Sequence, residues 1–162
     1  MTTRADELAG QFEAVNADVL AFVSACDDAA WARPCEGEGW TIGAVAAHIA
    51  DGHQAVVHWM RAILAGQPVT MTIDQLNESN ATRATTNTGR SRDDVLAALR
   101  ERGDKAAAFV RSLGDDDLER SAPFGLRDGE TVTAEWLISY ILTGHPRRHL
   151  RSLRASASTG TA

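Results

Sequence analysis

The sequence is poor in cysteine and in long hydrophobic runs, and each shortage argues against a class of protein. Its two cysteines, Cys26 and Cys35, are too few to hold a domain together by disulfides, and they do not form a C-x-x-C pair. We expect both to be reduced thiols that pack as small residues rather than act as nucleophiles. No apolar run approaches the roughly 18 to 20 residues that a membrane-spanning helix needs, so we expect no membrane partner.

Basic residues are also in the minority. The 162-residue chain carries 16 Lys and Arg against 22 Asp and Glu, which is a formal net charge of −6. Nucleic acids and anionic membrane surfaces require a basic footprint, so we expect neither as a partner. The N-terminal segment MTTRADELAGQF lacks the apolar stretch of a secretion signal, which predicts a cytoplasmic protein.

Four segments show the three- and four-residue spacing of apolar side chains that is typical of amphipathic helices. No segment shows a convincing strand pattern, and the length of the chain suits one domain. These features predict an all-α fold built as a four-helix bundle. The predicted helices cover residues 3–26, residues 41–65, residues 91–114, and a last segment that begins near Thr131 or Thr133.

The links between the predicted helices are uneven. The second link, residues 67–90, is long and rich in Asn and Thr, and long loops in compact domains are usually functional. Ile73 and Leu76 indicate a short helix within this link. The segment from Ala155 onward has no apolar anchor. We therefore assign the bundle to residues 1–154 and a flexible C-terminal tail to residues 155–162.

Five histidines are the most informative residues of the sequence. His145 and His149 are four residues apart, so on a helix they lie on one face and can bind one metal ion. A facing helix of the bundle could supply a third ligand. In the second predicted helix, the periodicity places His53 within the apolar arc, His48 at its rim and His58 on the solvated side. Histidines that are hydrogen-bonded within the core, without a metal, are the alternative.

Two short motifs resemble those of the DinB-like superfamily. The segment GWTIGAVAAHIADG, residues 39–52, is similar to the start of the second bundle helix in that superfamily, and GHPRRHL, residues 144–150, is similar to its H-x3-H element. The superfamily includes the N-terminal domain of mycothiol-dependent maleylpyruvate isomerase and the bacillithiol S-transferases. The resemblance covers nearly the whole chain, and it implies a four-helix bundle of DinB-like type with a long link between helices 2 and 3.

The resemblance implies that His48, His145 and His149 bind a divalent metal ion, for which zinc is our default and nickel the alternative. Because the periodicity favours His53 over His48, His53 stays a reserve candidate. Pro146 lies between two of the implied ligands and should kink or break the helix there. Such a change would either separate His145 from His149 or shape the turn so that their rings converge.

Partners for the second ring nitrogens of these histidines can also be sought in the sequence, because a metal-bound imidazole usually donates its other N–H. Asp51, Asn77 and Asn80 are the candidates. Arg148, next to His149, could contact an anionic substrate. Its position near the end of the last helix also suits a cation that opposes the helix dipole.

For function, the resemblance implies a metal-dependent thiol S-transferase or a thiol-dependent isomerase. The bound thiol, a low-molecular-weight compound such as mycothiol, would be deprotonated and attack an electrophile. No catalytic side chain is implied beyond a metal-bound thiol or water. Two alternatives remain, a metal-binding, stress-associated bundle without turnover and a metal-free helical dimerisation module. We also expect a homodimer, because many bundles of this size pair through a helix face.

Overall fold

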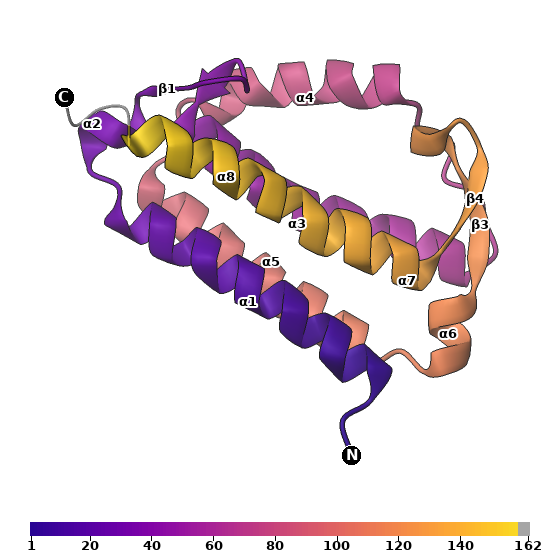
Figure 1. Cartoon of the computed structure of the whole chain (residues 1–162). Helices are drawn as coiled ribbons and strands as arrows, with labels where there is room; N and C mark the ends of the chain where they lie inside the picture. Colours follow the sequence, from indigo (N-terminus) through magenta and orange to yellow (C-terminus); the bar gives the residue numbers. More distant parts are fainter. Residues whose placement is uncertain (159–162) are drawn as a thin grey trace.

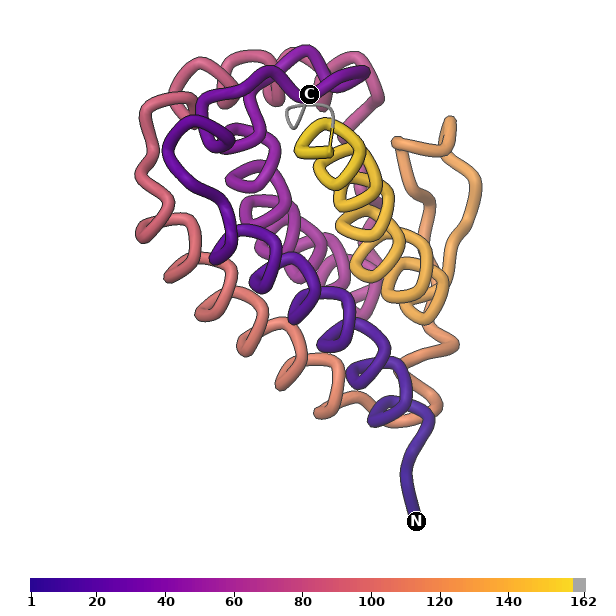
Figure 2. The backbone as a smooth tube through the Cα atoms, turned by 60° about the vertical axis from the view of Figure 1, so that its left-hand side comes forward, coloured from indigo at the N-terminus to yellow at the C-terminus, as the bar shows by residue number. Residues whose placement is uncertain are grey.

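A computed structural model describes residues 1–158 and contains four long helices joined by shorter helices and two small hairpins (Figure 1). Helix α1 lies beside α5, and α3 contacts both α5 and α8 (Figure 2). This arrangement confirms the predicted all-α four-helix bundle. None of the described helices is long and apolar enough to cross a membrane. The long helices are α1 (Arg4–Ala25), α3 (Ile42–Leu64), α5 (Arg92–Arg111) and a continuous run of α7 (Ala134–Trp136), η2 (Leu137–Thr143) and α8 (Gly144–Ser158).

The starts of the long helices are set by capping side chains. Thr3, Thr41, Ser91 and Thr133 each accept a hydrogen bond from the backbone N–H of the residue three positions later. Such caps satisfy N–H groups that the helix itself leaves without partners. The predicted starts agree with these caps, and the last helix begins after Thr133 rather than after Thr131.

The core consists of two adjoining clusters of buried apolar side chains. One includes Phe12, Met60 and Leu137, and the other includes Ile49 and Leu153. They occupy the apolar positions of the predicted helices, so their burial removes from water the face that the sequence pattern defined. The two cysteines are free and buried, as predicted. Burial raises the pKa of both thiols, which makes them poor nucleophiles.

Helix α4 (Ile73–Asn87) lies in the long second link and runs along the outside of the bundle (Figure 1). A capping box at Thr72 begins it, and its buried residues are Ala84 and Asn87. The sequence indicated only a short helix around Ile73 and Leu76, because a largely polar helix has almost no apolar periodicity to detect.

The expectation that the chain has no strands was wrong at two connections. Each hairpin is antiparallel, and its strands are too short to show a two-residue alternation. The first hairpin directly precedes α3 and the second directly precedes α7, so both determine how a long helix enters the bundle. The strands are β1 (Pro34–Cys35) with β2 (Trp40–Thr41), and β3 (Ser121–Phe124) with β4 (Glu130–Thr133); the remaining short elements are α2 (Asp28–Trp31), α6 (Asp115–Glu119) and η1 (Gly125–Arg127).

The last helix continues past the expected boundary at Ala155 and ends at Ser158. Ser156 is buried, and its Oγ accepts a hydrogen bond of 2.9 Å from the backbone N–H of Glu36. Arg33 donates a hydrogen bond to the carbonyl of Ala157. These contacts attach the segment 155–158 to the first hairpin. The rest of the expected tail, residues 159–162, lies outside the described residues.

Pro146 does not break the last helix. The backbone forms π-helical turns over Leu137–Thr143 and returns to the α-helical register at Gly144, so Pro146 is the third residue of α8. A proline is tolerated in the first turn after such a change of register, because the N–H that it lacks is not required there. The sequence analysis expected a kink or break because it assumed one uninterrupted α-helix.

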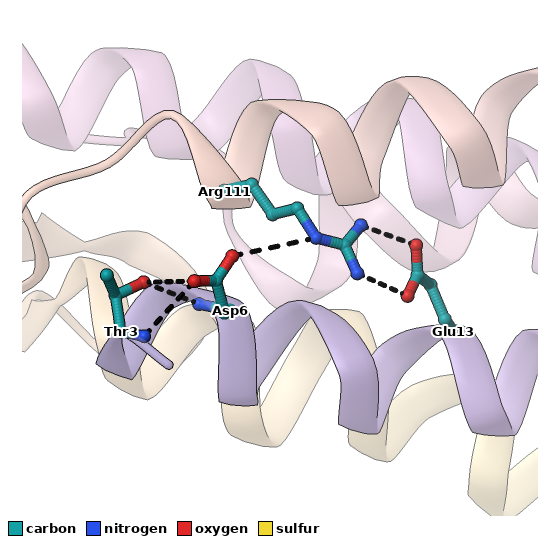
Figure 3. Close-up of polar contacts among 4 residues, drawn as sticks. All are labelled: Thr3, Asp6, Glu13 and Arg111. Carbon is teal, nitrogen blue, oxygen red and sulfur yellow. Dashed lines mark hydrogen bonds and ion pairs between the residues drawn. The ribbon is translucent and has the colours of Figure 1, made fainter. Parts of the chain in front are cut away.

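A surface cluster joins α1 to α5 (Figure 3). Arg111 donates two hydrogen bonds, of 2.5 and 2.6 Å, to the carboxylate of Glu13 and lies 3.8 Å from Asp6. Asp6 also accepts hydrogen bonds from the backbone N–H and the hydroxyl of Thr3. Exposed ion pairs contribute at most about 1 kcal/mol each, so the apolar contact between the two helices dominates.

Candidate metal centre

Three histidines from two helices meet at one point. His48 lies on the second turn of α3, and His145 and His149 lie on the first two turns of α8. Nε2 of His145 is 2.9 Å from Nε2 of His48 and 3.1 Å from Nε2 of His149. The structure therefore brings together the three residues that the resemblance marked as ligands, and together they could hold a metal ion.

Small and aromatic residues around the cluster position the rings. Gly52 lies one turn after His48, and a Cβ at that position would be 2.9 Å from Cε1 of His145. A side chain there would displace the ring of His145. Trp40 packs edge-on against His48, with ring centroids 5.2 Å apart. Trp40, in the hairpin before α3, and Gly52, within α3, therefore both contribute to the position of the histidine rings.

Hydrogen bonding alone does not satisfy these rings. A neutral imidazole nitrogen carries either one proton or one lone pair, so Nε2 of His145 cannot form two ordinary hydrogen bonds to His48 and His149. Three nitrogens that point at one another are the arrangement that a shared cation requires. Imidazole ligands suit zinc, copper, iron and nickel. The residues therefore fit a divalent metal ion.

Glu38 determines which nitrogen of His149 carries the proton. Nδ1 of His149 lies 2.9 Å from Oε1 of Glu38, and both side chains are 16% exposed. Because a carboxylate only accepts hydrogen bonds, Nδ1 donates, and in the neutral ring Nε2 keeps its lone pair towards the other two histidines. Such a partner orients a ligand and raises its basicity.

The sequence analysis missed Glu38 and proposed Asp51, Asn77 or Asn80 for this role. Asp51 instead accepts hydrogen bonds from Arg102 at 2.5 Å and from Asn87 at 3.2 Å, and so links α3 to α5 and α4. The only signal for Glu38 was its position two residues before Trp40, in the turn that leads into the histidine-bearing helix.

Burial favours the neutral form of two of the clustered histidines, His48 and His145. Burial, followed by the charge of His149, lowers the pKa of His48 to about 4. Burial also lowers the pKa of His145 well below the ordinary value. A neutral imidazole is the form that binds metal ions, so no proton has to be displaced from these two rings at neutral pH.

The other two histidines of the helix lie away from the cluster. His53, the reserve candidate, is buried as the periodicity predicted, but its Nε2 is 2.9 Å from Oδ1 of Asn16 and its ring packs edge-on against Phe12. His58 is exposed, also as predicted. His53 is thus a hydrogen-bonded core histidine, and His48 at the rim is the one that reaches α8.

We expect Glu38→Gln to weaken metal binding by about 10- to 100-fold, because loss of such a partner typically has that effect. The amide cannot serve as a charged acceptor for Nδ1 of His149. Titration of the metal-free protein with zinc measures the change. Glu36→Gln, in an exposed side chain two residues earlier, is the matched control. Equal affinities for all three proteins would contradict the assigned role of Glu38.

The three histidines lie at one end of a cleft of about 360 Å³, a volume typical of small-molecule sites. Trp59, which also lines it, is eleven residues beyond His48 on α3, which is about 16 Å along the helix. Phe124 packs edge-on against Trp59 and Trp136. The cleft therefore has a histidine end and an aromatic end.

The protein is thus a four-helix bundle that carries a cluster of three histidines at one end of a cleft. Its sequence matches the model of the DinB superfamily over residues 11–153, so the chain belongs to the DinB superfamily. No curated protein sequence matches the chain. The predicted family and the four-helix architecture are both confirmed.

Two solved structures show the same fold. One is YfiT from Bacillus subtilis, described as a probable metal-dependent hydrolase with an unusual four-helix bundle topology; the TM-score is 0.80 at 20% identity, over 99% of this chain and 89% of that chain. The other is mycothiol-dependent maleylpyruvate isomerase, with a TM-score of 0.76 at 16% identity, over 93% of this chain and 61% of that chain. A mutant of the isomerase aligns with a TM-score of 0.75. This chain therefore spans less than two thirds of the isomerase.

Proposed function

We propose that this protein is a metal-dependent enzyme that transfers a low-molecular-weight thiol to an electrophile, or uses such a thiol to isomerise one. The observation that carries the proposal is the convergence of three imidazole Nε2 atoms at one end of a cleft. His48, His145 and His149 would hold one divalent ion, zinc by default and nickel as the alternative. Such an ion, when bound, acts as a Lewis acid and lowers the pKa of a thiol.

The surrounding residues would support this chemistry in two ways. Glu38 holds His149 with a lone pair directed into the cluster. Trp40 and Ile141 line the cleft near the histidines, and their apolar surfaces would exclude water from a bound thiol. A sulfur anion formed there would be poorly hydrated, so its attraction to a cation would be stronger than in bulk water. The fold similarity to a mycothiol-dependent isomerase favours a thiol as the co-substrate.

Metal-dependent hydrolysis is the competing reaction, because the similar protein YfiT is described as a probable metal-dependent hydrolase. A cation that lowers the pKa of a thiol also lowers that of water, so the same ligands serve either nucleophile. The two reactions differ in whether turnover requires a thiol. This difference decides the design of the assay.

The test combines zinc- or nickel-loaded protein with mycothiol and monochlorobimane, in which the thiol sulfur displaces chloride and gives a fluorescent thioether. We expect conjugation that requires both metal and thiol and is lost in His145→Ala. Turnover of an activated ester without thiol would overturn the transferase in favour of a hydrolase. Bound metal without either reaction would indicate a bundle without turnover, and a chain that binds no metal would indicate the dimerisation module.

A further inference from the structure

We propose that Arg83 and Arg148 form a subsite for the carboxylate group of a reactant, next to the three histidines. Arg83 belongs to α4 and Arg148 to α8, and both line the cleft that contains His48, His145 and His149. The role of this subsite in a reaction depends on the proposed function. The binding of an anion to it does not, because the subsite consists of protein side chains alone.

Both guanidinium groups lack a carboxylate partner within residues 1–158. Arg83 makes no ion pair or side-chain hydrogen bond with this part of the chain, and Arg148 makes one long hydrogen bond of 3.5 Å to the carbonyl of Tyr140. A guanidinium carries five N–H donors in a planar fork that matches a carboxylate. Most of the donors of both arginines are therefore available to a ligand.

Other arginines near the cleft are paired with carboxylates. Arg102 is 2.5 Å from Asp51, and Arg90 is 3.6 Å from the same carboxylate. Arg127, which also lines the cleft, pairs with Glu130 at 2.5 Å. Among the arginines that line the cleft, Arg83 and Arg148 are therefore the two that have no carboxylate partner within residues 1–158.

The two acidic side chains that line the cleft already have partners. Asp51 is engaged by its two arginines, and Glu38 accepts a hydrogen bond from His149. Neither carboxylate is paired with Arg83 or Arg148.

The face of α4 that lines the cleft changes character along its length. Ile73, Leu76, Asn80 and Arg83 recur at intervals of three and four residues, so they share one face of the helix. The first two are apolar and the last two are polar. The helix thereby adds apolar surface at its beginning and an amide and a cation near its end.

Arg148 is placed by a glycine on its own helix. A Cβ at Gly144 would lie 3.3 Å from Nη1 of Arg148, so the missing side chain leaves room for the guanidinium to lie along the helix towards the carbonyl of Tyr140. In this position it borders the cleft. Arg147, the preceding residue, is exposed and does not line the cleft.

These features define a class of reactant. The aromatic end of the cleft suits an apolar body, and the two arginines suit a carboxylate close to the reacting atom. The carboxylate could belong to the electrophile or to the thiol. Two matched pairs of probes separate these sources: cinnamate with cinnamamide for an electrophile, and mercaptopropionate with its amide for a thiol.

The experiment is a ligand-observed NMR titration of the metal-free protein with each probe. Hydrogen bonds between charged groups are weakened where solvent reaches them, so we expect Arg83→Gln and Arg148→Gln each to weaken binding of an acid by about three- to tenfold. Binding of the amides should be unchanged in these variants. Raised salt should weaken only the acids. Arg147→Gln is the matched control on the same helix and should bind as the wild type does.

A preference for cinnamate over its amide assigns the carboxylate to the electrophile, and a larger preference for mercaptopropionate assigns it to the thiol. Equal affinities for acids and amides would overturn the subsite, as would an equal effect of Arg147→Gln. Both arginines are exposed, so the variants should retain the thermal unfolding midpoint of the wild type. The titration uses metal-free protein, so its outcome does not depend on the proposed function. If metal-loaded protein transfers no thiol while the acids still bind as expected, the proposed function is overturned and the subsite is not.

Discussion

Replacing His145 with alanine is expected to abolish metal binding. His145 is the central member of the cluster, because its Nε2 lies within 3.1 Å of both other Nε2 atoms. Its loss leaves one ligand on each of two helices. The loss of affinity should exceed the roughly 10- to 100-fold that follows removal of a hydrogen-bonding partner such as Glu38. Elemental analysis of untagged protein should find about one ion per wild-type chain and nearly none in the variant.

The loss should also appear in the stability of the protein. A ligand that binds only the folded chain stabilises it by about 2.7 kcal/mol at one hundred times its dissociation constant, and this increment should be absent in His145→Ala. His58→Ala, in an exposed residue of α3, is the matched control and should retain the ion. A wild-type chain that binds neither zinc nor nickel would contradict the metal centre. A fully loaded variant would exclude His145 as a ligand.

Acidification is expected to destabilise the metal-free protein through His53. Burial, with a smaller effect of the Arg102 charge, lowers the pKa of His53 to about 4, whereas in an unfolded chain it is about 6.5. Between these values the unfolded state binds more protons than the folded state. Stability that is present above pH 6.5 is therefore lost as the pH falls towards 4, by about 3 kcal/mol in total from this residue.

Urea unfolding between pH 7.5 and pH 4 measures this effect when wild type is compared with His53→Gln. The glutamine amide can still donate a hydrogen bond to Oδ1 of Asn16 but takes up no proton in this range. The variant should therefore lose less stability on acidification than the wild type. Since His48 and His145 titrate in both proteins, the difference isolates His53. Identical pH profiles would show that His53 is not held neutral by the fold.

The helices were predictable because their signals are local. Thr41 and Ser91 cap the helices that the sequence assigned to them, and apolar side chains at intervals of three and four define the buried faces. Helix α4 and the hairpins were not predictable in the same way. A polar helix and strands of two to four residues carry no periodicity, and contacts with the rest of the bundle hold them in place.

Two of the three candidate metal ligands were also predictable from a local pattern. The H-x3-H spacing by itself places His145 and His149 on one helix face. For the third position, helical periodicity favoured His53, because it measures how apolar a face is and not which element covers it. The structure shows that Asn16 and Phe12 cover His53, while α8 faces His48. The resemblance to the DinB-like superfamily chose His48.

The remaining expectations stay predictions. These are the homodimer, the absence of nucleic-acid partners and the cytoplasmic location. Zinc or nickel as the metal and mycothiol as the thiol belong to the proposed function. The position of Arg83 in the cleft could not be derived from the sequence at all, because it lies on the helix whose place was least predictable.

The sequence by itself determined the all-α class, the capped starts of the first three long helices and the placing of His145 and His149 on one helix face, because backbone geometry over a few residues decides each of these. Only the tertiary structure decided that His48 joins His145 across 97 residues of chain and that Glu38 reaches His149 across 111. Contacts between residues so far apart in the sequence depend on how the helices pack and on the direction in which the short hairpins lead the chain into them. No local pattern contains that information.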